Sequence, residues 1–169
     1  MQNSDIIQNK LQPALEECRL HQQRLHQAWT EALEFEAFAA NAVQSQLTEA
    51  QVRITDQLVF RFGRLQDAMG TRLLPAMLQL TQEWVDNEAF IDKLNRAEKI
   101  GLIPSTEQWQ MLREYRNQTA HEYPARPELV IANLKQLVAS VPLLEKILSQ
   151  LQQQAQRRIG TFKAEFKST

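Results

Sequence analysis

Apolar residues recur at alternating intervals of four and three positions near the end of the chain. They are Val130, Leu134, Leu137, Val141, Leu144, Leu148 and Leu151. This spacing places all of them on one face of an α-helix, which must bury that face against other helices. Pro142 falls inside the pattern. Because the apolar seam continues beyond it, we expect this proline to bend the helix and not to end it.

Similar patterns predict further helices. One stripe comprises Ile54, Leu58, Phe62, Leu65, Met69 and Leu73, and Pro75 after it predicts a kink or a break. A less regular pattern over residues 12–47, read as one helix or two, includes Leu15, Cys18, Leu25, Trp29, Leu33, Phe38 and Val43. A shorter helix is expected over residues 87–100, with Phe90, Leu94 and Ala97 on one face and Gly101 placed to end it.

One more helix carries the candidate chemistry. Ser105, with Gln108 three residues later, forms a capping-box pattern, and Pro124 ends the helix, which is predicted to cover residues 105–122. Its apolar stripe comprises Trp109, Leu112, Arg116, Thr119 or Ala120, and Tyr123. An arginine therefore occupies the side that faces the core.

Composition agrees with an all-α protein. Only four glycines and six prolines interrupt 169 residues, so we predict long helices with short connections and a single domain over residues 1–169. The tail from about residue 157 is expected to be loosely held.

Charge and cysteine content exclude some functions. A net charge of −1 argues against a protein that mainly wraps duplex nucleic acid, but allows a local site for RNA or a nucleotide. The single cysteine, Cys18, excludes an intramolecular disulfide and a cysteine-based zinc site. No secretory signal pattern or transmembrane segment is seen, so we expect a cytoplasmic protein.

Arg116 must be stabilised, because a buried guanidinium without a partner is costly. It is paired with a carboxylate such as Asp67 or Glu114, reaches the rim of the core, or lies in a polar cleft. His121 follows five residues later, about 140° around an ideal helix from Arg116. Fraying before Pro124 can bring the histidine to the same side.

Histidine and arginine together supply the minimum chemistry for cleaving an RNA phosphodiester without a metal ion. Histidine titrates near neutral pH and can take the proton of a 2′-hydroxyl or give one to the leaving oxygen. Arginine stabilises the phosphate as negative charge develops. Asn117, four residues before His121, can hydrogen-bond the imidazole or the phosphate, or serve as a surface or capping residue.

The spacing Arg116-x4-His121-x-Tyr123 resembles the R-x4-H-x-Y motif of HEPN domains. The similarity is to the subgroup of the HepT ribonuclease toxins and the nucleotidyltransferase substrate-binding proteins. The segment Phe60-Arg61-Phe62-Gly63-Arg64-Leu65-Gln66-Asp67 also looks like the second-helix segment of that subgroup, and the resemblance covers roughly residues 28–151.

The resemblance implies an up-and-down antiparallel bundle of four to five main helices that forms a homodimer. Arg116 and His121 of both subunits then line a shared cleft that cuts RNA without a metal or cofactor. The implied partner is a cognate minimal nucleotidyltransferase, the antitoxin, which adenylylates Tyr123. AMP attached two residues from His121 would obstruct the cleft and repel RNA.

Two alternatives stay open. The chain is a non-catalytic subunit that presents a nucleotide or other substrate to a nucleotidyltransferase, or it is a helical scaffold. In the scaffold, Arg116 belongs to a buried ion pair, His121 is a cation that the helix dipole favours, and Tyr123 is a packing aromatic.

Overall fold

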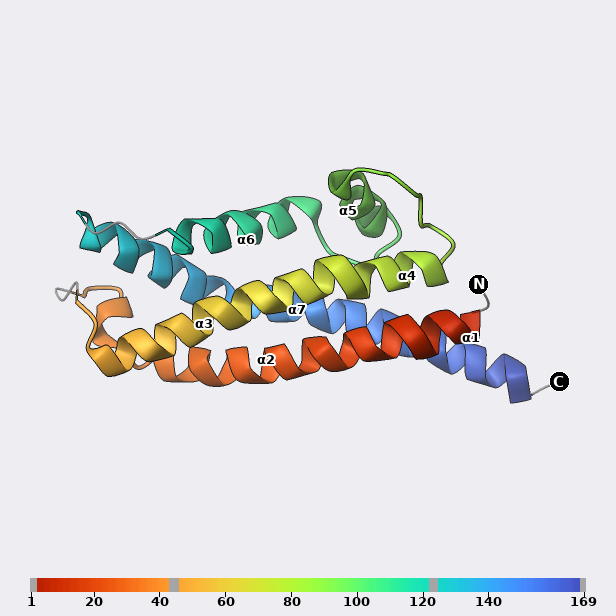
Figure 1. Cartoon of the computed structure of the whole chain (residues 1–169), viewed down its shortest axis with the longest axis horizontal. Coiled ribbons are helices and arrows are strands. Elements are labelled where there is room, and N and C mark those ends of the chain that lie inside the picture. The colour runs from red at the N-terminus through yellow and green to blue at the C-terminus, as the bar shows by residue number, and fades with distance from the viewer. Residues whose placement is uncertain (1–2, 43–45, 122–124, 168–169) are drawn as a thin grey trace. The chain divides into compact units, whose positions relative to one another are not determined.

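A computed structural model describes residues 3–42, 46–121 and 125–167. All regular elements in these ranges are helical, with no strand, so the predicted all-α helical bundle is confirmed (Figure 1). The elements are α1 (Asn3–Ile6), η1 (Ile7–Leu11), α2 (Gln12–Ala32), η2 (Glu36–Phe38), α3 (Glu49–Ala68), η3 (Met69–Leu73), α4 (Leu74–Leu80), α5 (Phe90–Lys99), α6 (Thr106–Thr119) and α7 (Pro127–Lys167).

The chain divides into two compact units. Unit 1 contains the residues up to Arg19, the segment Asp67–Gln108, and the residues from Glu145 onward. Unit 2 contains Leu20–Gln66 and Trp109–Leu144. The single domain expected from length stays a prediction, as does the loosely held tail, whose residues are helical up to Lys167.

Unit 1 is built around two π-helical segments that contact each other, η1 and η3. Each lies just before a proline, Pro13 or Pro75. A proline has no N–H to donate to the carbonyl four residues earlier, and its ring crowds that carbonyl, so the helix widens locally instead of keeping α geometry. The break predicted at Pro75 is therefore a π-helical segment followed by α4.

The α5 helix begins later than predicted, at Phe90 instead of residue 87, and its predicted end is confirmed. Gly101 has φ +75°, and the N–H of Leu102 donates to the carbonyl of Ala97 at 2.8 Å. This is the hydrogen bond of a helix that ends with a left-handed glycine. Leu94 and Ala97 are fully buried, whereas Phe90 is half-buried.

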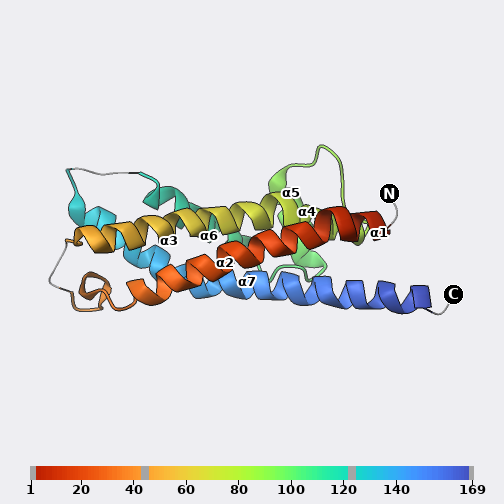
Figure 2. The same cartoon turned by 60° about the horizontal axis from the view of Figure 1, so that its bottom comes forward.

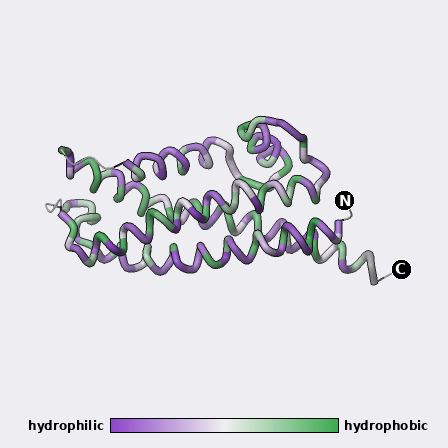
Figure 3. Tube along the Cα trace, in the orientation of Figure 1, coloured by the Kyte–Doolittle hydropathy of each residue, from purple (hydrophilic) through white to green (hydrophobic). Residues whose placement is uncertain are grey.

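The described part of unit 2 contains four α-helical segments, from α2, α3, α6 and α7, and successive segments run in opposite directions (Figures 1 and 2). Its core is apolar, and includes Leu25, Leu58, Phe62, Leu65, Trp109, Leu112, Leu137, Val141 and Leu144. Apolar and polar residues alternate along α2, α3 and α7, while α6 is mainly hydrophilic (Figure 3). Each of these three long helices is thus amphipathic and buries its apolar face in the core.

A polar contact joins each neighbouring pair of these four segments. His21 of α2 contacts Arg61 of α3 at 3.0 Å. The other contacts donate to backbone carbonyls: Gln66 to Trp109 at 3.4 Å, Asn133 to Gln118 at 3.4 Å, and Trp29 to Val138 at 2.9 Å. Each neighbouring pair of segments is thus held by a directional polar contact in addition to the apolar core.

The contact between Trp29 and Val138 explains why α7 continues through Pro142, as predicted. Val138 is four residues before Pro142, so its carbonyl would normally accept the N–H that a proline lacks. The indole Nε1–H of Trp29 donates to this carbonyl instead. The α7 helix thus loses one internal hydrogen bond and gains a contact with α2.

The first part of the chain differs most from its prediction. Helical structure begins at Asn3 instead of residue 12, and α2 ends at Ala32, followed by only a short 3₁₀ turn. Cys18 and Leu25 are buried as expected, but Leu15 is half-buried and Leu33 is 51% exposed. Small residues complete the buried face, namely Ala14, Ala28 and Ala32. Because alanine is only weakly hydrophobic, the pattern of large apolar residues did not reveal this face. Val43, which was part of the predicted pattern, lies outside the described residues.

Candidate functional site

The predicted helix start at Ser105 is confirmed, and the helix ends three residues earlier than predicted. The Ser105 hydroxyl accepts the N–H of Gln108 at 3.2 Å, and the Glu98 carboxylate accepts the N–H of Thr106 at 2.7 Å. The α6 helix ends at Thr119, not at residue 122. His121 consequently lies beyond the helix, as the expected fraying before Pro124 requires.

Hydrogen bonds hold the end of α6 in place. The carbonyl of Arg116 accepts the Thr119 hydroxyl at 2.8 Å and the N–H of Ala120 at 3.2 Å. The amide of Asn133, on α7, donates to the carbonyl of Gln118. These bonds satisfy carbonyls that a helix end otherwise leaves without donors. They also fix the position from which His121 leaves the helix.

His121 is exposed and lines a pocket of about 800 Å³ in unit 2. The pocket lies among α3, the end of α6 and the start of α7, and its lining residues are Gln46, Leu47, Val52, Thr55, Asp56, Val59, Phe60, Gln118, Thr119, Ala120, His121, Pro127, Val130, Ile131, Asn133 and Leu134. Its lining is mixed: apolar side chains alternate with polar ones, and of the described lining residues only His121 and Asp56 carry an ionisable group. Both its size and its mixed lining are typical of sites for organic ligands.

Arg116 lies on a different side of α6, against α3. It is half-buried, and a Cβ built on Gly63 would be 3.2 Å from its Nε and 3.8 Å from its Cζ. Arg116 is not among the described residues that line the pocket. A single chain therefore places His121 in the pocket and Arg116 beside Gly63. The predicted pairing of Arg116 with Asp67 or Glu114 stays a prediction.

The remaining predicted site residues have different outcomes. Asn117 is exposed and is not among the described pocket residues, so its role in orienting the histidine stays a prediction. Its neighbour Gln118 lines the pocket instead, and donates to the carboxylate of Glu114 at 3.3 Å. Tyr123 lies outside the described residues.

The structure adds residues that the sequence interpretation did not assign to the site, above all Phe60. Its side chain is 57% exposed and lines the pocket with His121. A signal was present, because Phe60 stands two positions before the buried Phe62 and so falls off the apolar stripe of its helix. Asp56 and Asn133 offered no comparable signal, since surface helices commonly carry such residues.

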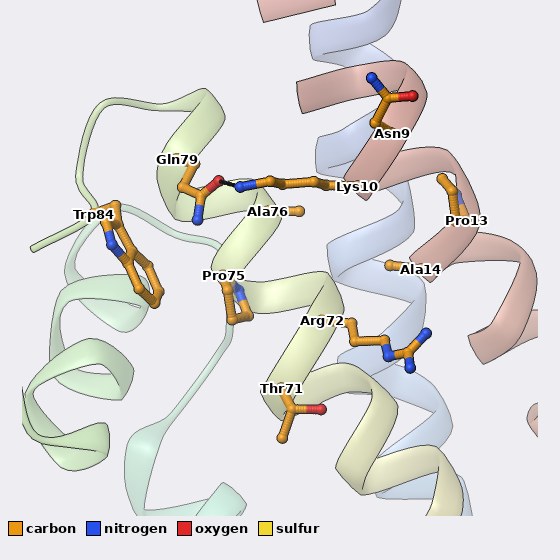
Figure 4. A pocket seen from close by; sticks show the side chains of 10 residues that line it. All are labelled: Asn9, Lys10, Pro13, Ala14, Thr71, Arg72, Pro75, Ala76, Gln79 and Trp84. Atoms are coloured by element: carbon orange, nitrogen blue, oxygen red, sulfur yellow. Dashed lines mark hydrogen bonds between the residues drawn. The ribbon is translucent and has the colours of Figure 1, made fainter. Parts of the chain in front are cut away.

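Unit 1 has a pocket of its own, of about 390 Å³ (Figure 4). Lys10 reaches across it from η1 and donates to the Gln79 side chain of α4 at 2.7 Å. Arg72, also in its lining, pairs with Glu17 at 3.0 Å. Both cations are thus engaged by the protein itself. This leaves the pocket of unit 2 as the stronger candidate.

Within the described ranges, no group of three or more histidine, cysteine, aspartate or glutamate residues is arranged to hold a metal ion. None of the described helices is both long and apolar enough to cross a membrane. In comparisons with known proteins, no family model, curated protein or solved structure matches this chain.

Proposed function

We propose that this protein is a HEPN-type endoribonuclease that cleaves RNA without a metal ion and acts as the toxin of a toxin–antitoxin pair. The observation that carries the proposal is the position of His121, which leaves the end of α6 and lines a pocket of about 800 Å³. The sequence motif and the all-helical bundle support the same assignment. A cytoplasmic location, where RNA is abundant, is part of the proposal.

The proposed reaction is an internal transesterification of RNA. A base removes the proton of a ribose 2′-hydroxyl, and the 2′-oxygen attacks the adjacent phosphorus. The bond from phosphorus to the 5′-oxygen breaks, and an acid protonates that leaving oxygen. The products are a 2′,3′-cyclic phosphate and a free 5′-hydroxyl, with no change of oxidation state and no water consumed. Arg116 stabilises the charge that develops on the phosphate oxygens.

A homodimer is part of the proposal because the reaction uses an acid and a base at the same time. Each subunit contributes one histidine, His121, to the candidate site. A cleft shared by two subunits supplies two imidazoles, so that one can act as the base while the other acts as the acid. It also lets Arg116 of one subunit meet a phosphate held beside His121 of the other.

Control by a nucleotidyltransferase completes the proposal. The Tyr123 oxygen loses its proton and attacks the α-phosphorus of ATP. The bond from that phosphorus to pyrophosphate breaks, pyrophosphate is released, and AMP stays attached to the tyrosine. Its support is the short distance in sequence from Tyr123 to His121, since a nucleotide attached there adds bulk and negative charge beside the pocket. Unmodified protein should cut RNA, and adenylylated protein should not.

The pocket also favours a second candidate function, a non-catalytic subunit that binds a nucleotide or other substrate for a nucleotidyltransferase. A volume of about 800 Å³ is sufficient for a nucleotide, and the exposed ring of Phe60 offers a surface for a base. Under this function ATP or AMP binds the wild-type protein in calorimetry while RNA is left intact.

The experiment that separates the two functions analyses the ends of the RNA. Wild-type protein purified without its nucleotidyltransferase is incubated with RNA in EDTA, and the products are examined by mass spectrometry. Fragments with 2′,3′-cyclic phosphate ends support the nuclease. Intact RNA, together with saturable nucleotide binding that Phe60→Ala weakens, supports the binding subunit.

A further inference from the structure

Three arginines gather on α2 and α3 of unit 2, beside the candidate pocket. Arg61 contacts the Nδ1 of the buried His21 at 3.0 Å. Because a guanidinium has only donors, the imidazole nitrogen must accept this bond. Burial lowers the pKa of Arg61, and the nearby positive charges of Arg24 and Arg64 lower it further. Arg24 and Arg64 are thus both close enough to Arg61 for their charges to act on its guanidinium.

No ion pair within the described part of the chain involves this group, which we call the arginine cluster (Arg24, Arg61 and Arg64). Arg24 and Arg64 are exposed, and neither forms an ion pair or hydrogen bond with a described residue. The buried Nε of Arg61 also has no hydrogen-bond partner among those residues. Like charges held together without a counter-charge raise the free energy of the fold, and an anion would lower it.

An exposed aromatic ring connects the arginine cluster with the pocket. The guanidinium carbon of Arg61 is 5.3 Å from the centre of the Phe60 ring, a cation–π contact. Phe60 is 57% exposed and also lines the pocket that contains His121. Phe60 therefore contacts Arg61 of the arginine cluster and also belongs to the pocket that contains His121.

We propose that the arginine cluster and Phe60 bind a single-stranded segment of RNA, with its phosphates on the arginines and a base stacked on the ring. This inference rests on the proposed function, because the bound segment is the part of the RNA substrate that extends from the cleavage site. Proteins that bind single strands combine a positive groove with aromatic rings in this way. Arg61 and Arg64, three residues apart on α3, have their Cβ atoms about 5 to 6 Å apart, which suits contacts along one strand.

The chemistry favours a nucleic acid over an acidic protein partner. Aspartate and glutamate side chains would satisfy the arginines, but they make no use of an exposed phenyl ring. A single-stranded nucleic acid satisfies both, because every base has a flat face that stacks. Duplex is a poorer fit, since its bases are not free to reach Phe60. The near-neutral net charge agrees with a local site instead of a basic surface.

Binding of a fluorescent 2′-O-methyl RNA strand tests the proposal, because this probe lacks the attacking hydroxyl and cannot be cleaved. The double variant Arg24→Gln/Arg64→Gln removes two charges from exposed positions. For a single strand, each phosphate contact contributes about −0.7 to the slope of log affinity against log salt concentration. The loss of two contacts should therefore lower the affinity in 0.1 M salt about 25-fold. Phe60→Ala should weaken binding about tenfold with little effect on the salt slope.

The matched control is Arg157→Gln/Lys163→Gln, which removes two exposed charges from α7 in unit 1. It should bind the probe within about twofold of the wild type if only screened long-range charge is lost. Equal affinities of the control and the Arg24→Gln/Arg64→Gln variant would overturn the proposal. So would an oligoglutamate peptide that binds the cluster as tightly as RNA and is insensitive to Phe60→Ala.

The outcomes separate this inference from the proposed function. A wild type that binds the probe through the arginine cluster but leaves ordinary RNA intact contradicts only the nuclease. A wild type that cleaves RNA, with an Arg24→Gln/Arg64→Gln variant that binds the probe unchanged, contradicts only this inference. Melting curves of all variants confirm that binding is compared between folded proteins.

Discussion

Gly63 lies directly against the guanidinium of Arg116. A Cβ at this glycine would be 3.2 Å from the Nε of Arg116, closer than an ordinary van der Waals contact. Gly63 stands inside α3, where glycine costs about 1 kcal/mol relative to alanine. The missing side chain therefore has a function in packing, since it leaves room for Arg116 to approach α3.

We expect Gly63→Ala to reduce RNA cleavage about tenfold while the protein stays at least as stable. The added methyl group displaces the guanidinium by a few tenths of an ångström, and small displacements of catalytic groups are costly. Alanine meanwhile favours the helix. Gly160→Ala is the control, because nothing lies within 4 Å of a Cβ there. Cleavage by Gly63→Ala at the wild-type rate would show that the position of Arg116 is unimportant.

Arg116→Ala distinguishes a catalytic arginine from a structural one. If Arg116 belongs to a buried ion pair, its loss lowers the free energy of unfolding by about 3 to 5 kcal/mol. Because its side chain is only half-buried, we expect a loss of about 1 kcal/mol, as for an average substitution, and complete loss of cleavage. Urea unfolding measures the first quantity. A loss of 3 kcal/mol or more would favour the scaffold.

Trp29 and Pro142 are coupled through the carbonyl of Val138. Trp29→Phe should lower the free energy of unfolding by about 1 to 3 kcal/mol, because this buried acceptor loses its donor. In a Pro142→Ala background the alanine N–H can supply the missing bond, so the same change should cost less. Denaturant unfolding of the four proteins measures the coupling. Equal costs in both backgrounds would argue against it.

This coupling also illustrates what a sequence can predict. The long apolar stripes around Leu58 and Leu144 correctly placed α3 and α7, because each pattern is local and repeats over many turns. The same pattern also predicts that α7 continues beyond Pro142. The cause of this continuation was not predicted, because Trp29 lies 109 residues away from Val138 in sequence.

The candidate site was predictable to a smaller extent. The motif identified His121, and Pro124 predicted that the helix would fray before it. Phe60 and the arginine cluster depend on contacts between α2 and α3, which helical periodicity does not contain. Arg116 was correctly placed on a packed side of α6, but the space that Gly63 provides for it appears only in three dimensions.

Cys18 should be inert in the folded protein. The thiol is fully buried, and burial, with a smaller effect of Glu17, raises its pKa to about 12. Above the ordinary value of 9.0 the unfolded state loses this proton and the folded state keeps it, so this group's contribution to stability falls from pH 9 to 12. We expect no reaction with iodoacetamide at pH 8 until urea unfolds the chain. Rapid labelling of native protein would contradict the burial.

The central claim is tested most directly by one cleavage assay. Wild-type protein and His121→Ala, both free of nucleotidyltransferase and confirmed by mass to lack AMP, are incubated with single-stranded RNA in EDTA. We predict that the wild type produces fragments with 2′,3′-cyclic phosphate ends and that His121→Ala leaves the RNA intact. RNA that stays intact with the unmodified wild type, or is cut equally by both proteins, would contradict the proposal that His121 catalyses RNA cleavage.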